Sequence, residues 1–299
     1  MACSRLNPVF NLAKQQARQM MIKRAATIGI DWPQEVANLC ARGGEMAFSP
    51  QWDAELAAIA NPSLTYPDYY LRPFHAYEQG NLSWEAATEV EVAAHAVHAR
   101  IWPDAGAQGD ARLRQSYHAV VQAQVSQPPQ EILDLGCSVG MSTLALQGVY
   151  PQARVTGVDL SPYFLAIAHY RCQQQQTQAT WIHAPAEATG LPTAQFDLVS
   201  ACLLYHELPQ SAAIAILQEA RRLLRPGGYL TIMDMNPGSA VYAQMPPYIL
   251  TLLKSTEPYL DEYFALDLEA EIVEAGFLPP TVTANSVRHR TVIAQVPPL

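Results

Sequence analysis

The sequence has no long apolar run and only a few, isolated cysteines. No stretch reaches the ~18 consecutive apolar residues that a membrane-spanning helix needs, so we expect no membrane span. The cysteines are Cys3, Cys40, Cys137, Cys172 and Cys202. They are odd in number and form no Cys-x-x-Cys pair, which argues against a disulfide framework and against a zinc or other metal site. Such thiols suit a reducing compartment, and we expect a cytoplasmic protein.

Basic charge is also scarce. The chain carries 18 Lys and Arg against 27 Asp and Glu, a net charge of −9, and this balance argues against general nucleic-acid binding. The start of the chain differs, because five basic residues precede the first acid at Asp31: Arg5, Lys14, Arg18, Lys23 and Arg24. A transit peptide or a membrane-surface helix has this pattern. The uninterrupted helical periodicity favours a helix of an N-terminal module instead.

The first third of the chain is predicted to be helical. Residues 1 to about 60 carry helical periodicity, which a stretch rich in proline and tyrosine at 61–77 interrupts. A further helix is expected from Ser83, a good N-cap, to Trp102, where Pro103 ends it. With 299 residues, of which 49% are hydrophobic, the chain exceeds one ordinary domain and can fill a sizeable core.

The remainder is typical of an α/β domain. Apolar runs of strand length alternate with helical segments, and this order predicts a doubly wound, mostly parallel sheet with crossover helices. Strands are expected near 131–136, 154–159, 179–184, 197–204 and 229–235, and helices near 111–125, 141–149, 162–175 and 211–224. We therefore divide the chain into a helical lid or substrate module at 1–110 and an α/β domain at 111–299, with an insertion near 236–260.

A glycine-bearing turn follows the first predicted strand. Gly136 and Gly140 let the backbone turn sharply and approach a ligand, and Asp159 ends the next apolar run, where a carboxylate that binds ribose hydroxyls belongs. A dinucleotide fingerprint has a third glycine for the pyrophosphate. Here Gly136, Ser138 and Gly140 alternate and that third glycine is missing, which disfavours NAD(P).

The pattern Asp-Leu-Gly-Cys-x-x-Gly at 134–140 resembles the first motif of class I S-adenosylmethionine-dependent methyltransferases. Segments at 158–161, 186–209 and 221–235 are similar to later motifs of the same family, so that the resemblance covers roughly 116–299. It implies a seven-stranded Rossmann-like sheet that ends in an antiparallel hairpin. It also implies S-adenosylmethionine as the cofactor.

The resemblance assigns cofactor contacts to this sequence. The residues so assigned are Asp134, Gly136, Cys137, Ser138, Gly140, Asp159, Leu160, Ala186, Glu187 and Cys202. Asp134 is expected near the ammonium group of the cofactor, and Ser138 stands where the family has its middle glycine. Pro185 replaces an aspartate that often contacts adenine, which leaves Ala186 and Glu187 as the nearest candidates.

Two of these assignments have alternatives. Asp159 precedes Ser161 and Pro162, so that it could be a helix N-cap instead of a ribose ligand. Glu187 could be a solvated carboxylate of a loop, since acids are common on protein surfaces.

Few catalytic side chains are needed for methyl transfer from a sulfonium, because its methyl group is already electrophilic. Tyr205 and His206 follow the fourth predicted strand, where enzymes of the resembling family place residues near the transferring methyl. His206 could accept a proton from the acceptor, and His75 is a second candidate base. His206 could instead be a helix-capping or packing histidine.

The sequence thus predicts a methyltransferase for a small, aromatic or lipophilic acceptor. Aromatic residues clustered at 66–84 and 242–263 are expected to roof an apolar pocket. The alternatives are an NAD(P)-dependent oxidoreductase and a non-catalytic S-adenosylmethionine-binding protein whose helical region binds a partner. The acceptor atom and the oligomeric state, a homodimer included, stay open.

Overall fold

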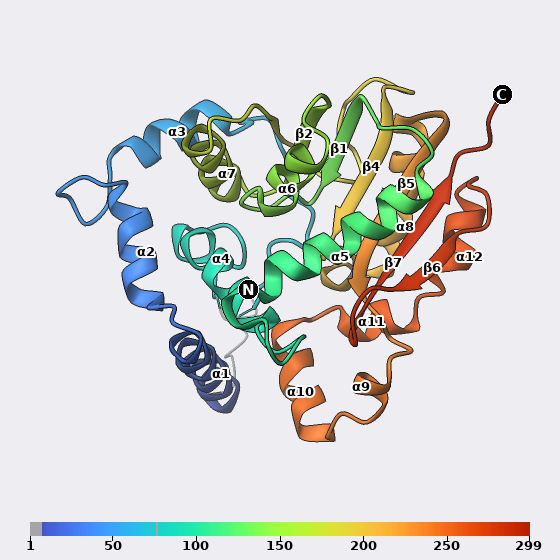
Figure 1. The fold of residues 1–299 in the computed structure, drawn as a ribbon. Coiled ribbons are helices and arrows are strands. Elements are labelled where there is room, and N and C mark those ends of the chain that lie inside the picture. Colours follow the sequence, from blue (N-terminus) through green and yellow to red (C-terminus); the bar gives the residue numbers. More distant parts are fainter. Residues whose placement is uncertain (1–7, 76) are drawn as a thin grey trace.

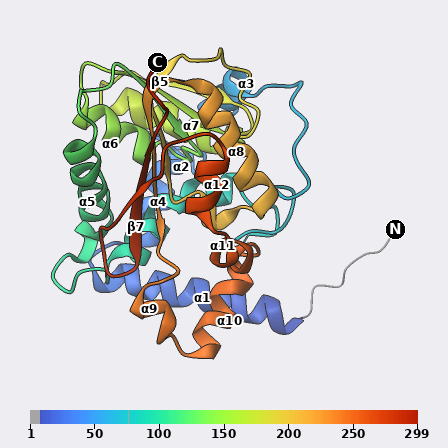
Figure 2. The same ribbon diagram turned by 90° about the vertical axis from the view of Figure 1, so that its right-hand side faces the viewer.

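A central sheet with helices on both faces organises the protein, and further helices lie along one of its edges (Figures 1 and 2). The computed structural model describes residues 8–75 and 77–299, so that Cys3 and Arg5 lie outside the described residues. Helices α5 and α6 cover one face of the sheet, whereas α8 and α12 cover the other (Figure 2). None of the helices in the described ranges is long and apolar enough to cross a bilayer.

The sheet has seven strands in the order β3-β2-β1-β4-β5-β7-β6. Their bounds are β1 Glu131–Leu135, β2 Arg154–Asp159, β3 Thr180–His183, β4 Phe196–Cys202, β5 Leu224–Met235, β6 Thr281–Ala284 and β7 His289–Gln295. Strands β1 to β5 pair in parallel, and β7 is antiparallel to both β5 and β6. The strand order reverses between β1 and β4, and at such a reversal the carboxyl ends of the strands open into a crevice.

Twelve α-helices lie in the described part of the chain. They are α1 Pro8–Thr27, α2 Trp32–Ala41, α3 Gln51–Ile59, α4 Trp84–His98, α5 Gly109–Gln124, α6 Met141–Val149, α7 Pro162–Gln174, α8 Gln210–Leu223, α9 Ala240–Ala243, α10 Pro247–Thr256, α11 Leu260–Ala265 and α12 Leu268–Glu274. A 3-10 turn, η2 Tyr205–Glu207, follows β4. The predicted doubly wound sheet, its terminal hairpin and the N-terminal helices are confirmed.

Two boundaries differ most from the sequence prediction. Helix α4 ends at His98 and not at Trp102, because the chain turns there and brings Gly109 against the carbonyl of His98. A Cβ added to Gly109 would lie 2.2 Å from that carbonyl oxygen. Strand β5 begins at Leu224 and not near residue 229, because Leu224 already pairs with Phe196 across an irregular register. Neither change moves the carboxyl ends of the strands.

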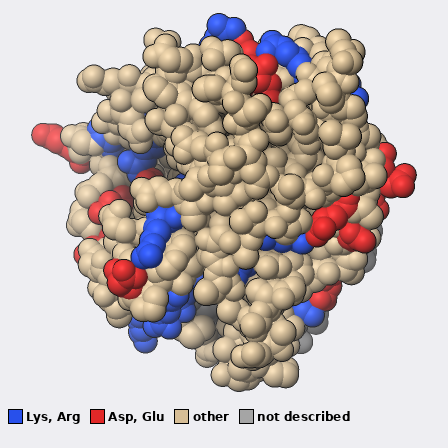
Figure 3. Space-filling view, turned by 45° about the vertical axis from the view of Figure 1, so that its right-hand side comes forward, with Lys and Arg blue, Asp and Glu red and all other residues tan. Residues whose placement is uncertain are grey.

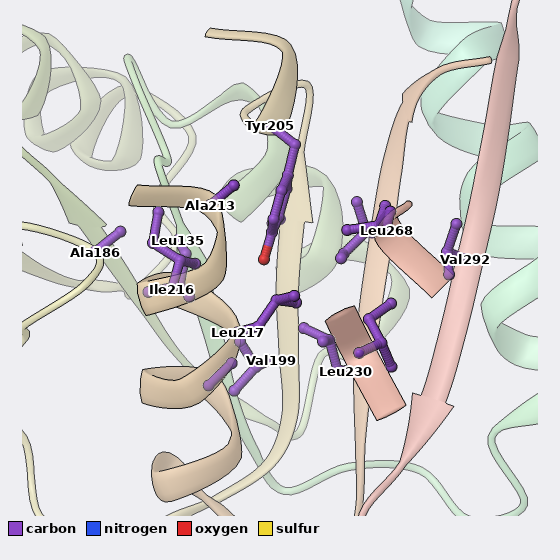
Figure 4. Packing of buried hydrophobic residues seen from close by; sticks show 14 of the residues in the cluster. Leu135, Ala186, Val199, Tyr205, Ala213, Ile216, Leu217, Leu230, Leu268 and Val292 are labelled. Atoms are coloured by element: carbon purple, nitrogen blue, oxygen red, sulfur yellow. The ribbon is translucent and has the colours of Figure 1, made fainter. Parts of the chain in front are cut away.

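The largest core cluster fills the space between the sheet and helices α8 and α12 (Figure 4). A second cluster lies between the sheet and α5. There the hydroxyl of Tyr117 is 2.9 Å from Ser200 Oγ and 2.6 Å from Thr231 Oγ1, so that one buried hydrogen-bonded group fixes α5 across β4 and β5. A fully satisfied buried network of this kind specifies one arrangement of the helix on the sheet.

The N-terminal helices pack directly on the α/β domain. Trp52 of α3 is fully buried beside α7, and Ser161 Oγ donates a 2.6 Å hydrogen bond to the carbonyl of Asn81. Ser83 caps α4 as predicted, because its side chain accepts from Ala86 N at 3.2 Å. Helix α1 is joined to α4 by the ion pair of Arg18 with Glu89. Both ribbon views also place α1 beside α10.

Candidate active site

The turn between β1 and α6 has the backbone conformation that its glycines predict. Gly136 has φ +65° and Gly140 φ +84°, both in the left-handed region that favours glycine. A Cβ on Gly136 would lie 2.6 Å from the side chain of Leu204, so a larger residue would press into the loop after β4. The turn is therefore held open toward the crevice by the small size of its residues.

Ser138, at the place of the missing middle glycine, adopts the conformation that glycine prefers. Its φ is +51°, which costs a non-glycine residue about 1–2 kcal/mol. The amide of Ser138 donates to Asp159 Oδ2 at 2.8 Å, whereas its Oγ is buried without a hydrogen-bond partner among the described residues. The strained turn thus aims one amide at Asp159 and leaves one hydroxyl for a ligand.

Asp159 closes the crevice from the end of β2. Its two carboxylate oxygens accept the amides of Ser138 at 2.8 Å and of Ser161 at 2.7 Å. The N-cap of α7 is Ser161, whose side chain accepts from Phe164 N, so that the N-cap alternative for Asp159 is wrong. Burial raises the pKa of Asp159 to about 6. The carboxylate is rigidly held and has lone pairs left for further donors.

Asp134 lies beneath the turn and does not line the crevice. Its Oδ2 accepts the hydroxyls of Ser142 at 2.6 Å and of Thr143 at 2.7 Å, whereas its Oδ1 is buried without a partner among the described residues. Burial raises the pKa of Asp134 to about 6. Asp134 therefore holds the first turn of α6 in place. Ser142, one of its two hydrogen-bond donors, itself lines the cavity.

Arg114 of α5 is a site residue that the sequence analysis missed. Its Nε donates to Asp110 Oδ2 at 2.9 Å, and its terminal nitrogens face Cys202 Sγ at 3.4 Å and Met141 Sδ at 3.9 Å. Its Nη2 also donates to Asp110 Oδ1 at 3.3 Å, whereas among the described residues Nη1 faces only sulfur, which is a weak acceptor. This one nitrogen is therefore poorly satisfied at the wall of the crevice. The Asp110–Arg114 pair at i, i+4 was the available signal, but such pairs are typical of solvent-facing helix surfaces.

Glu187 is not a solvated loop carboxylate. It is half-buried, its Oε1 accepts the hydroxyl of Tyr69 at 2.8 Å, and its Oε2 is buried without a partner among the described residues. Ala186 lines the crevice, whereas Glu187 and Gly140 stand behind its wall. The contact ties the loop after β3 to the segment before α4.

His206 lies in η2 and is oriented by Asp234 of β5. The two side chains meet at 2.8 Å between Nδ1 and Oδ1, and Asp234 Oδ2 also accepts the amide of Tyr205 at 2.8 Å. Burial opposes the charged imidazolium, but the carboxylate of Asp234 outweighs it and raises the pKa of His206 to about 10. With Nδ1 engaged, Nε2 is the nitrogen that a ligand in the cavity can reach.

His75 lies opposite His206 and bridges two segments. Its Nε2 is 3.2 Å from Glu257 Oε1 and 3.8 Å from Glu207 Oε1, and its amide donates to the carbonyl of Thr256 at 3.0 Å. Burial lowers the pKa of His75, yet Glu257 more than compensates and the net direction is upward. Burial raises the pKa of Glu207 to about 7. His75 therefore serves an ion-pair cluster at the cavity wall.

Tyr205 is not brought to the cavity. Its side chain is fully buried in the core cluster on the α8 face, with its hydroxyl end pointing into the packed interior (Figure 4). Only its backbone serves the site, through the amide bond to Asp234. We therefore assign no catalytic role to the Tyr205 side chain.

One continuous cavity of about 600 Å³ connects these groups. The turn at 136–140 between β1 and α6 is the predicted cofactor turn. The side of the cavity next to it is lined by Gly136, Cys137, Ser138, Asp159, Leu160, Ala186 and Cys202. From there the cavity passes His206 and His75 and continues between α4, α1 and α10. Its volume is in the range of pockets that enclose cofactors and drug-sized ligands.

Comparison with known proteins identifies the family. A family model described as a methyltransferase domain matches residues 132–228. An uncharacterized methyltransferase of Synechocystis sp. is 31% identical over 150 residues, which cover 50% of this chain and 68% of that protein. The chain belongs to the class I S-adenosylmethionine-dependent methyltransferases. A trans-aconitate 2-methyltransferase of Azoarcus sp. is 42% identical over 101 residues, covering 34% of this methyltransferase and 37% of the relative.

The fold of this methyltransferase agrees with that assignment. It is similar to phosphoethanolamine N-methyltransferase 2 of Haemonchus contortus in complex with S-adenosyl-L-methionine, with a TM-score of 0.55 at 13% identity. The match covers 80% of this chain and 61% of that chain. Membership of the family makes S-adenosylmethionine the methyl donor. The Ser138 Oγ, which has no partner among the described residues, and the sulfur-facing Nη1 of Arg114 fit a polar ligand in the crevice.

Proposed function

We propose that this enzyme methylates a small organic acceptor with an aromatic or lipophilic body. The observation that carries the proposal is the continuity of the cavity, which leads from the cofactor turn past His206 into a chamber between helices. Apolar and aromatic residues dominate that chamber, among them Phe74, Val90, Met245, Leu252 and Leu253. An acceptor with an apolar body is stabilised there by removal of its surface from water.

In this proposal each polar group of the crevice holds one part of the cofactor. Asp159 accepts the ribose hydroxyls, Arg114 binds the carboxylate of the methionine portion, and the Ala186 segment lies against the adenine. Asp134 places a buried negative charge near the ammonium group through the turn that it anchors. When bound, S-adenosylmethionine supplies an electrophilic methyl on a sulfonium, and the chain has only to align the acceptor and exclude water.

We propose that His206 holds or removes the proton of the acceptor atom. With a pKa of about 10 the imidazole of His206 is protonated at neutral pH. The carboxylate of Asp234 binds the proton on Nδ1, which leaves Nε2 to exchange its proton with a ligand. A positive charge close to the ring lowers an imidazole pKa. The sulfonium is such a charge, so that loading the crevice brings His206 closer to the range in which Nε2 accepts a proton.

The described residues of the N-terminal module, 8–75 and 77–110, and the insertion at 236–260 together form the proposed lid. His75, from the N-terminal module, binds both the carbonyl of Thr256 and the carboxylate of Glu257 at the end of α10. Tyr69 ties the same module to Glu187 behind the crevice. The cavity is therefore roofed by two segments that are far apart in sequence, which suits a site that must exclude water.

The test is methyl transfer in a cell extract. The enzyme is incubated with extract and S-adenosylmethionine labelled in its methyl group, and the labelled product is identified by mass. Label in a small molecule with an aromatic or alkyl body supports the proposal. Label found only in protein or nucleic acid, or no label beyond that of a His206→Ala, Asp159→Asn double variant, contradicts it.

A further inference from the structure

Two arginines of the cavity wall come from elements other than those that form the cofactor turn. Arg24 comes from α1, and Arg288 directly precedes β7. Strand β7 lies two positions beyond β4 in the sheet, which at the usual spacing between strands is about 10 Å. The cofactor turn follows β1, on the other side of β4, so Arg288 at the start of β7 lies three strands away from that turn.

Neither arginine is neutralised by the protein. Within 8–75 and 77–299 no carboxylate lies within 4 Å of Arg24 or Arg288, and the contact of the Arg288 guanidinium is a 3.4 Å bond to the carbonyl of Val97. Arg18, which also lines the cavity, is by contrast paired with Glu89. Burial, together with the like charges of Arg100 and Arg288, lowers the pKa of Arg24. Cations thus gather there without a counter-charge.

The cavity wall near the arginines is mostly apolar, apart from the imidazoles of His98 and His289, which also line it. It includes Val97 of α4, Tyr242 and Met245 of the insertion, and Ile249 of α10. Charged residues make up 15% of the sequence, and the face of the molecule in Figure 3 is mostly uncharged. An unpaired cationic pair beside a mostly apolar wall is therefore a local feature of this cavity.

We propose that the methyl acceptor carries an oxyanion at the end opposite its methylated atom, and that Arg24 and Arg288 bind this group. The inference rests on the proposed function and specifies its substrate class: an apolar body with a carboxylate, sulfonate or phosphate on the order of 10 Å from the reacting atom. Guanidinium groups match such oxyanions with two parallel hydrogen bonds. The apolar wall favours an apolar body between this oxyanion and the methylated atom.

The experiment uses two fluorescent probes with the same ring system. Anilinonaphthalene sulfonate is an apolar anion, and N-phenyl-1-naphthylamine is its neutral counterpart without the sulfonate. The full-length enzyme is first saturated with S-adenosylhomocysteine, so that the cofactor crevice is closed to both probes. Binding is then titrated for the unmodified enzyme, for Arg24→Gln and Arg288→Gln, and for Arg154→Gln, which removes an exposed arginine at the opposite end of β2.

The expected result is a loss specific to the anion. Each cavity variant should bind the sulfonate about tenfold more weakly, the scale of one charge-assisted hydrogen bond, with the neutral probe unchanged. Arg154→Gln should alter neither, and Arg288→Lys should restore much of the sulfonate affinity. Equal losses for both probes, or none for the sulfonate, overturn the inference and leave the proposed function standing. Failure of S-adenosylhomocysteine to bind overturns both.

Discussion

Asp159→Asn tests the centre of the proposed cofactor site. Both carboxylate oxygens of Asp159 accept backbone amides, from Ser138 at 2.8 Å and from Ser161 at 2.7 Å. An asparagine side chain offers a single acceptor oxygen, so its NH₂ group would face one of these N–H donors. The substitution therefore removes a charge from the ribose position and also leaves one amide of the turn without a partner.

The magnitude follows from the number of bonds lost. A hydrogen bond to a charged group contributes about 1.5–3 kcal/mol, and an unsatisfied buried amide costs about 1–3 kcal/mol. The ribose contact alone predicts a rise in the dissociation constant of S-adenosylhomocysteine of about 10- to 100-fold. The unsatisfied amide should lower the free energy of unfolding by about 1–3 kcal/mol.

The assay is isothermal titration with S-adenosylhomocysteine, combined with urea unfolding. Asp197→Asn is the matched control, because Asp197 also accepts two backbone amides, from Gln130 and Glu131 at 2.9 Å, but at the amino end of the sheet. The control should lose stability and keep its cofactor affinity. Unchanged affinity in Asp159→Asn, or equal loss in both variants, would refute the assignment of Asp159 to the ribose.

The same carboxylate predicts a pH dependence. Because the pKa of Asp159 is raised to about 6, cofactor affinity should weaken as the pH falls through about 6, where the accepting carboxylate becomes protonated. Terminal groups resembling those of the methionine portion titrate near ~3.5 and ~8, which leaves this window to the protein. In Asp159→Asn the pH dependence near 6 should diminish, and a profile identical to that of the unmodified enzyme would point to Asp134.

Three further predictions concern neighbouring groups. Arg114→Met should weaken S-adenosylhomocysteine binding by about tenfold or more but leave adenosine binding unchanged, and an equal loss for both ligands would contradict the carboxylate contact. The carboxylate of Asp234 raises the pKa of His206 above the ordinary 6.5, so the ion pair stabilises the fold fully below about pH 6.5 and ceases to do so as the pH rises through about 10. In Asp234→Asn, NMR titration should show the pKa of His206 falling toward 6.5. An unchanged pKa would exclude Asp234 as the cause of the shift. Ser138→Gly should raise the free energy of unfolding by up to about 1 kcal/mol, since relief of left-handed strain exceeds the entropic cost of glycine. A lower free energy of unfolding in urea would show that the Ser138 hydroxyl stabilises the fold, although it has no hydrogen-bond partner among the described residues.

Local patterns were sufficient for the sheet and the cofactor turn. The predicted strands that end at Leu135 and Asp159 lie side by side, as expected, because buried strands and glycine-bearing turns leave their signal in neighbouring residues. The prediction was less exact where a contact with another element sets the end of a helix. The end of α4 at His98 depends on Gly109, which packs against it from the next helix, and no residue within α4 announces that contact.

The catalytic side of the site could be predicted only in part. His206 and Tyr205 are adjacent in sequence and equally suited to proton transfer by residue type, yet one lines the cavity and the other is buried in the core. Arg114 belongs to no sequence motif. It is a site residue because it contacts Cys202, which is 88 positions away in sequence. Such roles are set by the direction of a side chain and by long-range neighbours.

The sequence by itself determined the family and the donor, and it predicted the edge of the sheet at which the site is proposed, because these depend on short motifs whose backbone conformation is local. The tertiary structure alone decided what lines the proposed acceptor pocket. Arg24 and Arg288 lie more than 260 positions apart in the sequence, and they line one cavity only after α1 has packed beside α4 and α10. Since a pocket is made of surfaces from several elements, its charge and shape emerge only after those elements have packed.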